Sequence, residues 1–308
     1  MIDKKTILKV ENLSVQVING RKRIDIVKNV SFEVKEGERW AIAGESGAGK
    51  SMTMKAITAL MPQGSTAVSG KILFRTDAAD TDAADTDNTG TDAAGQKYTE
   101  QGNTDQGWQD LLALPYAKRH AFVARHVAII FQDSINALNP NERIIRQWSE
   151  TVRLYEPGIG NEELEKHLLS RMDIFGVRGG KETLYKYPDQ LSGGMRQRIA
   201  IAMALESPAR LLIADEPTTS LDAINQRSTV DFIQELLNRS GRTLLYISHN
   251  LGLLQYICDH IIIMKDGYMI EQGTTDEVFF NGKEDYTRQL VRETMKIMGH
   301  REEGDPHE

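Results

Sequence analysis

The alternation of hydrophobic and polar residues predicts a group of short strands at the start of the chain. Residues 7–10, 13–17 and 30–34 alternate apolar with polar side chains, which is the period of a half-buried sheet. Asn19-Gly20 and Glu36-Gly37 are turn signals between them. The first forty residues are therefore predicted to form a sheet with one buried face.

A different pattern follows, in which fully apolar runs alternate with helical segments. The apolar runs are residues 40–43, 127–131, 211–214, 243–247 and 261–264. Helices are predicted from about residue 50 to 60, through most of 143–185, and from 285 onward; a tight turn at 265–267 leads into a last hairpin. Apolar strands alternating with helices are typical of a parallel sheet covered on both faces, so an α/β fold is predicted.

One segment fits neither pattern. In residues 76–95 the five-residue unit Thr-Asp-Ala-Ala-Asp repeats and then decays. Without large apolar side chains it cannot offset the entropy of ordering, so we predict an acidic, disordered insert at 76–107, with order resuming near Trp108. A calcium-binding or partner-binding tether is the alternative, but the spacing of a calcium loop is absent.

The insert also explains the charge of the chain. The 308 residues carry a net charge of −7, yet residues 77–110 hold nine acids and one base, so the remainder is nearly neutral. A neutral body does not favour binding to nucleic acid. No apolar run approaches the roughly 18 residues of a membrane span, and no signal peptide is recognised, so a cytoplasmic location is expected. Cys258, the only cysteine, excludes an internal disulfide and is expected to pack as a small hydrophobe.

The first candidate site is a phosphate-binding loop between a predicted strand and a predicted helix. Its glycines allow a tight turn that points backbone N–H groups at phosphate oxygens. In this reading Lys50 contacts the β- and γ-phosphates of a nucleoside triphosphate, and the Ser51 hydroxyl is a Mg²⁺ ligand. The loop consists of Gly44, Glu45, Ser46, Gly47, Ala48, Gly49, Lys50 and Ser51.

Two carboxylates follow the apolar run 211–214. Asp215 and Glu216 are predicted at the C-terminal edge of the sheet, where α/β proteins bind ligands. We expect Asp215 to belong to the Mg²⁺ shell and Glu216 to polarise the attacking water.

The stretch Leu191-Ser192-Gly193-Gly194-Met195-Arg196-Gln197-Arg198 is predicted to open a helix, with Ser192 as its N-cap. Free N–H groups and the helix dipole make such a start favourable for an anion. With the phosphate loop upstream, this stretch resembles the signature of the ATP-binding-cassette (ABC) ATPases.

The resemblance implies a P-loop NTPase with a RecA-like parallel-sheet core, an N-terminal antiparallel β subdomain and an α-helical signature subdomain at about 135–205. The ATPase domain would span 1–295, followed by a tail at 296–308. It implies ATP and Mg²⁺ as ligands. It also implies a dimer, in which Ser192, Gly193 and Gly194 bind, in trans, the ATP of the partner subunit.

Three smaller motifs fall where the family places them. Gln132 resembles the glutamine that senses the γ-phosphate and Mg²⁺, and His249 resembles the switch histidine. Ser220-Leu221-Asp222 resembles the loop that meets the dimer mate.

The segments 131–140, 187–188, 213–219 and 285–290 resemble the peptide/nickel importer branch of that family. This implies an ATPase subunit at the cytoplasmic face of the membrane, with a second and paralogous ATPase subunit, two permeases and a solute-binding protein as partners and no nucleic acid. The sequence does not distinguish between peptides, nickel and metal chelates as the transported substrate. An ABC exporter subunit and a soluble ABC ATPase acting on nucleic acid or ribosomes remain as alternatives.

This sequence departs from the branch at three positions. Val17 stands where many relatives carry an aromatic residue that stacks on adenine, which leaves open what contacts the base. Ser134 replaces a proline, and Asn250 replaces the acid after the switch histidine. None of these changes removes a catalytic group.

Overall fold

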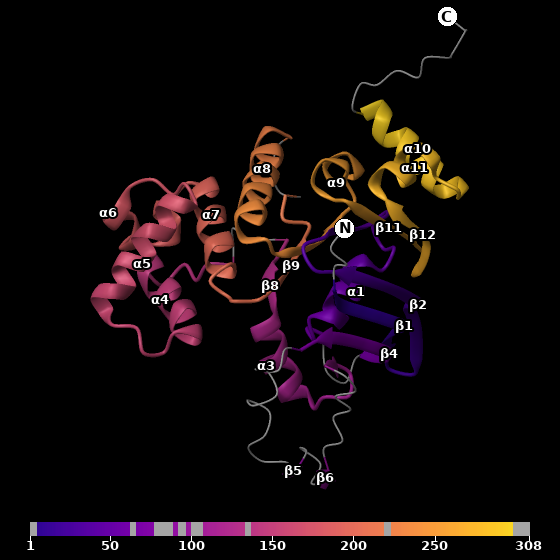
Figure 1. Cartoon of the computed structure of the whole chain (residues 1–308), viewed down its shortest axis with the longest axis horizontal. Helices are drawn as coiled ribbons and strands as arrows, with labels where there is room; N and C mark the ends of the chain where they lie inside the picture. The colour runs from indigo at the N-terminus through magenta and orange to yellow at the C-terminus, as the bar shows by residue number, and fades with distance from the viewer. Residues whose placement is uncertain are drawn as a thin grey trace, which may run out of the picture.

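The computed structural model describes residues 5–61, 66–76, 89–91, 97–99, 107–132, 137–218 and 223–297. Strands from the first part of the chain form an antiparallel sheet of order β2-β1-β4-β7. A six-stranded sheet of order β12-β11-β3-β10-β9-β8 forms the centre of the molecule. Figure 1 shows the antiparallel sheet on one side of this centre and a group of helices on the other.

The antiparallel sheet corrects one prediction, because residues 7–10 and 13–17 belong to a single strand, β1 (Thr6–Asn19). Its inward residues are Leu8 and Val10 before Asn12, but Leu13 and Val15 after it. A bulge at Asn12, with φ of 50°, shifts the alternation by one residue and keeps all four side chains in the core. The alternation therefore breaks in the sequence although the strand continues.

The rest of this sheet assembles around β1. The Asn19-Gly20 turn joins β1 to β2 (Lys22–Lys35), and Gly20 has a positive φ of 60°. On the other side of β1 lies β4 (Thr66–Arg75), followed by β7 (Trp108–Asp110).

The central sheet is parallel from β8 to β11, as predicted, with β12 added antiparallel at one edge. Successive residues of one strand point to opposite faces of the sheet, and Ala41 and Ile42 accordingly belong to two separate hydrophobic clusters. Both faces of the sheet are therefore covered. The strands are β3 (Arg39–Ala43), β8 (Val127–Ile130), β9 (Leu211–Asp215), β10 (Thr243–Ser248), β11 (His260–Lys265) and β12 (Tyr268–Thr274).

Helices connect these strands. The segment after β3 is α1 (Lys50–Ile57), β10 is preceded by α8 (Ala223–Ser240) and followed by α9 (Leu251–Ile257), and α3 (Tyr116–His126) leads into β8. Parallel strands end at one edge, so the residues after β3, β8, β9 and β10 lie close together. Cys258, after α9, is buried as predicted.

The helical region is built between β8 and β9. It contains α4 (Ile144–Tyr155), α5 (Asn161–Ile174), α6 (Gly180–Leu184) and α7 (Gly193–Ala204). Trp148 of α4 is fully buried, and its indole N–H donates to Glu206 after α7 at 2.9 Å. This contact joins the first helix of the region to the end of the last.

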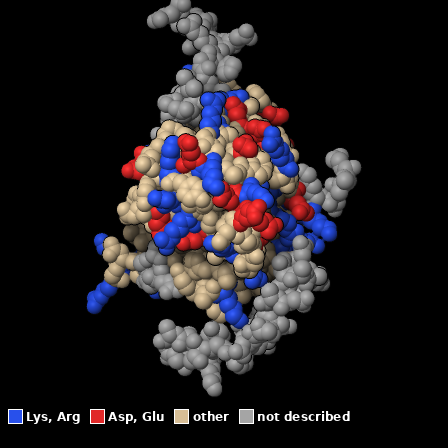
Figure 2. All heavy atoms as spheres, turned by 90° about the vertical axis from the view of Figure 1, so that its left-hand side faces the viewer, with Lys and Arg blue, Asp and Glu red and all other residues tan. Residues whose placement is uncertain are grey.

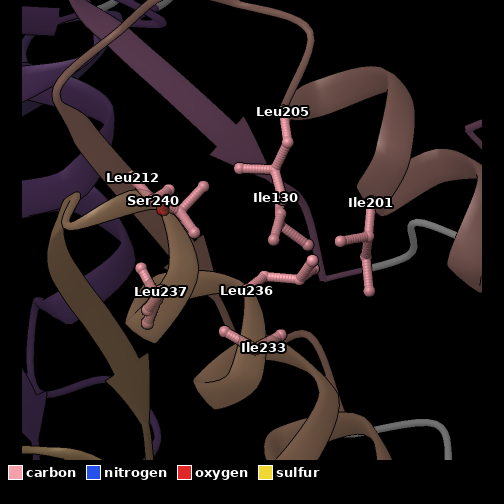
Figure 3. Close-up of a pocket in the computed structure, with 8 residues that line it drawn as sticks. All are labelled: Ile130, Ile201, Leu205, Leu212, Ile233, Leu236, Leu237 and Ser240. Atoms are coloured by element: carbon pink, nitrogen blue, oxygen red, sulfur yellow. The ribbon is translucent and has the colours of Figure 1, made fainter. Parts of the chain in front are cut away.

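A small apolar pocket lies where α7 and α8 cover β8 and β9 (Figure 3). Apart from Ser240, it is lined by aliphatic side chains, among them Ile130, Leu212 and Leu236. Without a charged group it has no means of binding a phosphate, and it is a gap in core packing.

Two helices and two short strands complete the description. The C-terminal helices α10 (Thr275–Asn281) and α11 (Asp285–Ile297) follow β12. Within the acidic insert, β5 (Thr89–Thr91) and β6 (Lys97–Thr99) pair antiparallel, which the prediction of a disordered insert did not include. Most of the insert lies outside the described residues.

Candidate functional site: a nucleotide site at the edge of the central sheet

The phosphate loop lies between β3 and α1, as the sequence predicts. Gly44, Gly47 and Gly49 have φ values of 145°, 85° and 100°, a region that disfavours any side chain. A Cβ atom at Gly44 would collide with the carbonyl oxygen of Met264, and one at Gly49 would lie 2.8 Å from the carbonyl oxygen of Ile26. The loop is therefore packed tightly between the end of β11 and β2, and its backbone shape requires glycine.

Lys50 begins α1 and turns back over the loop. Its side chain is buried, and Nζ donates to the carbonyl oxygens of Gly44 at 2.8 Å and Glu45 at 2.9 Å. Burial lowers the pKa of Lys50, while the charges of Glu216 and Asp215 act in the opposite direction. The ammonium group is thus fixed between the loop carbonyls and faces the carboxylates that end β9.

Ser51 and Asp215 form the other polar pair beside the loop. The Ser51 hydroxyl donates to Oδ1 of Asp215 at 3.4 Å. Burial raises the pKa of Asp215, and the neighbouring charge of Glu216 raises it further. Both effects would be relieved by a bound cation.

The donor set at this position fits Mg²⁺. A hydroxyl and a carboxylate are hard oxygen donors, which Mg²⁺ prefers, and this ion usually takes its remaining ligands from phosphates and water. In the part of the chain that the structure describes, no group of three or more His, Cys, Asp or Glu side chains could hold a metal. The pair therefore suits an ion that arrives with a nucleotide.

Glu216, Gln132 and His249 meet at the edge of the sheet. Oε1 of Glu216 lies 3.1 Å from Nδ1 of His249, and Nε2 of Gln132 donates to Oε2 at 3.5 Å. Glu216 has a φ of 44°, an unusual conformation for a residue with a side chain, and its N–H donates to the carbonyl of Ile247 at 2.9 Å. The structure thus brings together three side chains from the ends of β8, β9 and β10.

The signature residues do not reach the phosphate loop of the same chain. Ser192 caps α7 by accepting a hydrogen bond from the N–H of Met195 at 3.3 Å, as predicted. However, α7 packs with α4, α5 and β8, whereas α1 packs against β1, β2, β9 and β10 (Figure 1). The signature helix and the helix that carries the phosphate loop therefore pack in different parts of the fold.

Gln197, to which the sequence interpretation gave no separate role, connects α7 with the segment that follows Glu216. Its side chain is buried, and Nε2 donates to the carbonyl oxygen of Pro217, the residue after Glu216, at 3.0 Å. Its Oε1 accepts from Thr229 of α8 at 3.3 Å. The sequence feature that could have indicated this contact is a glutamine on the buried face of the signature helix. Only the structure identifies the partner of that glutamine.

The departures from the family pattern have different outcomes. Asn250 accepts a hydrogen bond from the N–H of Leu253 at 3.4 Å, so it caps α9, as the usual acid could. Val17 of β1 lies opposite Ile24 of β2, and this pair is aliphatic on both strands. Ser134 and the segment Ser220-Leu221-Asp222 lie outside the described residues.

Comparison with known proteins decides the family. The family model described as ABC transporter matches residues 27–219, more than half of the chain. The chain belongs to the ABC transporter family. This confirms the recognition made from the phosphate loop and the signature.

The ABC relatives include import proteins. The chain is 32% identical to the dipeptide transport ATP-binding protein DppD of Bacillus subtilis, over 94% of this chain and 77% of that protein. It is 31% identical to the metal-staphylopine import system ATP-binding protein CntD of Staphylococcus aureus, over 89% of each. It is 34% identical to the peptidoglycan transport ATP-binding protein YejF of Agrobacterium fabrum, over 92% of this chain but only 46% of that protein.

The ABC fold is confirmed by a solved structure. CbiO1 of Clostridium perfringens, described as part of an ABC transporter complex, superposes with a TM-score of 0.66 and 24% identity, covering 96% of this chain and 98% of that one. Among the described residues, no helix combines the length and the apolar composition that crossing a membrane requires.

Proposed function

We propose that this ABC protein is the ATP-hydrolysing subunit of an importer for peptides or metal chelates. The observation that supports the proposal best is the meeting of Gln132, Glu216 and His249 beside the phosphate loop. This arrangement places a histidine and an amide within hydrogen-bonding reach of one carboxylate, whose charge also acts on the Lys50 ammonium.

The geometry supports a role for each residue. The loop N–H groups and Lys50 would bind the phosphates, and Ser51, Asp215 and Gln132 would hold Mg²⁺, which would neutralise charge on the phosphates. Glu216 accepts a hydrogen bond from the attacking water and orients it toward the γ-phosphate. His249 fixes the orientation of the Glu216 carboxylate and donates toward the charge that develops on the phosphate oxygens.

The nucleotide site requires a second subunit. The N-terminus of α7 offers N–H groups and a favourable dipole for an anion, yet it lies away from the loop of its own chain. In a dimer, Ser192, Gly193 and Gly194 would complete the partner's site, and the partner would complete this one. Hydrolysis would then open the dimer and move the helical region against two permease subunits at the cytoplasmic face of the membrane.

The nature of the cargo is inferred from the relatives. DppD is named for dipeptides, CntD for metal-staphylopine and YejF for peptidoglycan, so peptides and metal chelates are the classes we propose. A separate solute-binding protein would select among them. An exporter role has no comparable support among these names.

Action on nucleic acid is the second candidate function, and the charge distribution on one face of the molecule does not favour it. Over the face of the molecule shown in Figure 2, basic and acidic side chains are intermixed. Binding to a phosphate backbone instead favours a concentration of Lys and Arg on one face.

The decisive experiment compares wild type with Glu216→Gln in uptake and in ATP turnover. In cells lacking the native gene, we expect wild type to restore uptake of a labelled dipeptide or a chelated metal, and Glu216→Gln to fail. The purified variant should bind Mg·ATP but hydrolyse it at least about 100-fold more slowly.

Glu235→Gln is the matched control, because Glu235 lies exposed on α8 and forms an ion pair with Arg239 of the same helix. It should leave uptake and turnover unchanged. If the wild-type protein restores uptake of neither cargo class in these cells, the importer role is excluded. Undiminished hydrolysis by Glu216→Gln would exclude only the proposed role of Glu216 and would leave the importer role standing.

A further inference from the structure

Tyr286, in the C-terminal helix α11, contacts the start of the phosphate loop. Its hydroxyl accepts a hydrogen bond from the N–H of Glu45 at 3.4 Å, across 241 positions of sequence. Nζ of Lys265, the last residue of β11, lies 4.4 Å from the centre of the tyrosine ring. The ring is thus placed between the end of β11 and the loop.

The peptide group that Tyr286 contacts is also the one that holds Lys50. The N–H of Glu45 and the carbonyl of Gly44 belong to one planar unit. The N–H donates to Tyr286, and the carbonyl accepts from Nζ of Lys50 at 2.8 Å. A rotation of this peptide would break both hydrogen bonds, and each bond polarises the group in the sense that strengthens the other.

The start of α11 is itself fixed to the sheet. The carboxylate of Glu271 in β12 accepts from the N–H groups of Lys283 at 2.8 Å and Glu284 at 3.2 Å. Arg288 donates to the carbonyl oxygens of Gly282 and Lys283 and pairs with Asp285. Tyr286, the second residue of α11, therefore lies in an anchored helix start. Figure 1 shows α11 close to β11 and β12.

We propose that Tyr286 is a positioning residue for ATP binding, which orients the Gly44–Glu45 peptide and through it the Lys50 ammonium. The C-terminal helix is thereby part of the nucleotide site, although it contributes no group that touches ATP. This inference rests on the proposed role of Lys50 in binding phosphate.

The test compares Tyr286→Phe with wild type in the full-length chain. The phenylalanine keeps the ring beside Lys265 and removes only the hydroxyl. We expect Kd and KM for Mg·ATP to rise about fivefold, the effect of one net hydrogen bond, with kcat changed by less than about twofold. Hydrogen exchange at the Glu45 amide should also become faster.

Tyr268→Phe is the matched control. Tyr268 is also a tyrosine beside a lysine, since Nζ of Lys28 lies 4.8 Å from its ring centre, but it is exposed and lies on β12. This variant should leave Kd, KM and exchange at Glu45 at wild-type values.

Two further results separate the possible failures. Lys50→Ala should abolish ATP binding, and normal binding by that variant would overturn the proposed site. If Lys50→Ala loses binding while Tyr286→Phe matches wild type in Kd, KM and Glu45 exchange, the role of Tyr286 is excluded and the proposed site stands. A lower melting temperature of Tyr286→Phe with unchanged Kd and KM would also exclude it.

Discussion

Nδ1 of His249 lies 3.1 Å from Oε1 of Glu216, and the two residues follow neighbouring parallel strands. The Glu216 side chain is only 13% exposed, whereas the His249 side chain is 54% exposed. The N–H of Glu216 also donates to the carbonyl of Ile247 in β10. Ile247 in β10 and His249 just after it therefore hold the backbone and the side chain of the glutamate, while the histidine side chain stays partly exposed at the edge of the sheet.

We expect His249→Ala to lower kcat for ATP hydrolysis by on the order of 100-fold, with a smaller change in the Kd for Mg·ATP, because the carboxylate loses the partner that orients it. Steady-state hydrolysis and equilibrium binding measure the two effects. Asn250→Ala is the control: removing the cap of α9 should cost about 1 kcal/mol of stability and preserve turnover. Equal losses of turnover in both variants would contradict a specific role for His249.

The buried carboxylate of Glu206 should be a main stabilising group of the helical region. Its side chain is 4% exposed, lies 2.9 Å from Nε2 of His167 and 3.4 Å from Nε of Arg171, and accepts from Trp148. Glu206→Ala removes the acceptor of the Trp148 indole N–H and the ion-pair partner of Arg171, so we expect a loss of about 3 kcal/mol in denaturant unfolding.

Glu150→Ala provides the comparison, because Glu150 forms an exposed pair with Arg146 at 3.4 Å within α4. Its removal should cost less than about 0.5 kcal/mol. Similar losses in the two variants would show that burial does not strengthen the Glu206 contacts.

Glu271 should stabilise the C-terminal helices in a pH-dependent way. Burial acts to raise the pKa of Glu271, but the hydrogen bonds that its carboxylate accepts from the N–H groups of Lys283 and Glu284 outweigh it. The pKa therefore lies below its ordinary value of 4.5. A lowered pKa means that the carboxylate stabilises the fold above pH 4.5, and that this contribution is lost as the pH falls through the lowered pKa.

Glu271→Ala should thus be less stable than wild type at pH 7, and the difference should shrink as the pH is lowered below 4.5. Denaturant unfolding over this pH range measures the difference. A gap that stays constant down to the lowest pH would mean that the ionised carboxylate contributes nothing.

The single cysteine should be unreactive in the folded protein. Cys258 is buried, and burial raises the pKa of its thiol well above the usual range, so little thiolate forms. A disulfide reagent at pH 8 should label native protein slowly and unfolded protein stoichiometrically. Rapid labelling of native protein would indicate local opening after α9.

The sequence predicted those parts of the site that depend on neighbouring residues. The glycines at 44, 47 and 49 adopt backbone angles that disfavour side chains, and the Ser192 side chain caps the helix that follows it. The apolar runs form the strands of the parallel sheet, and the apolar side chains themselves mark these strands as buried. The bulge at Asn12 escaped prediction because it depends on pairing with two other strands.

The amino-acid sequence by itself therefore determined the strands, the phosphate loop, the helix caps and the types of side chain at the site. Only the tertiary structure decided that Glu216 meets both Gln132 and His249, that Gln197 holds the segment after Glu216, and that Tyr286 lies against Glu45. The physical reason is range: backbone conformation and capping depend on residues a few positions apart, whereas these contacts depend on the order in which distant strands pair.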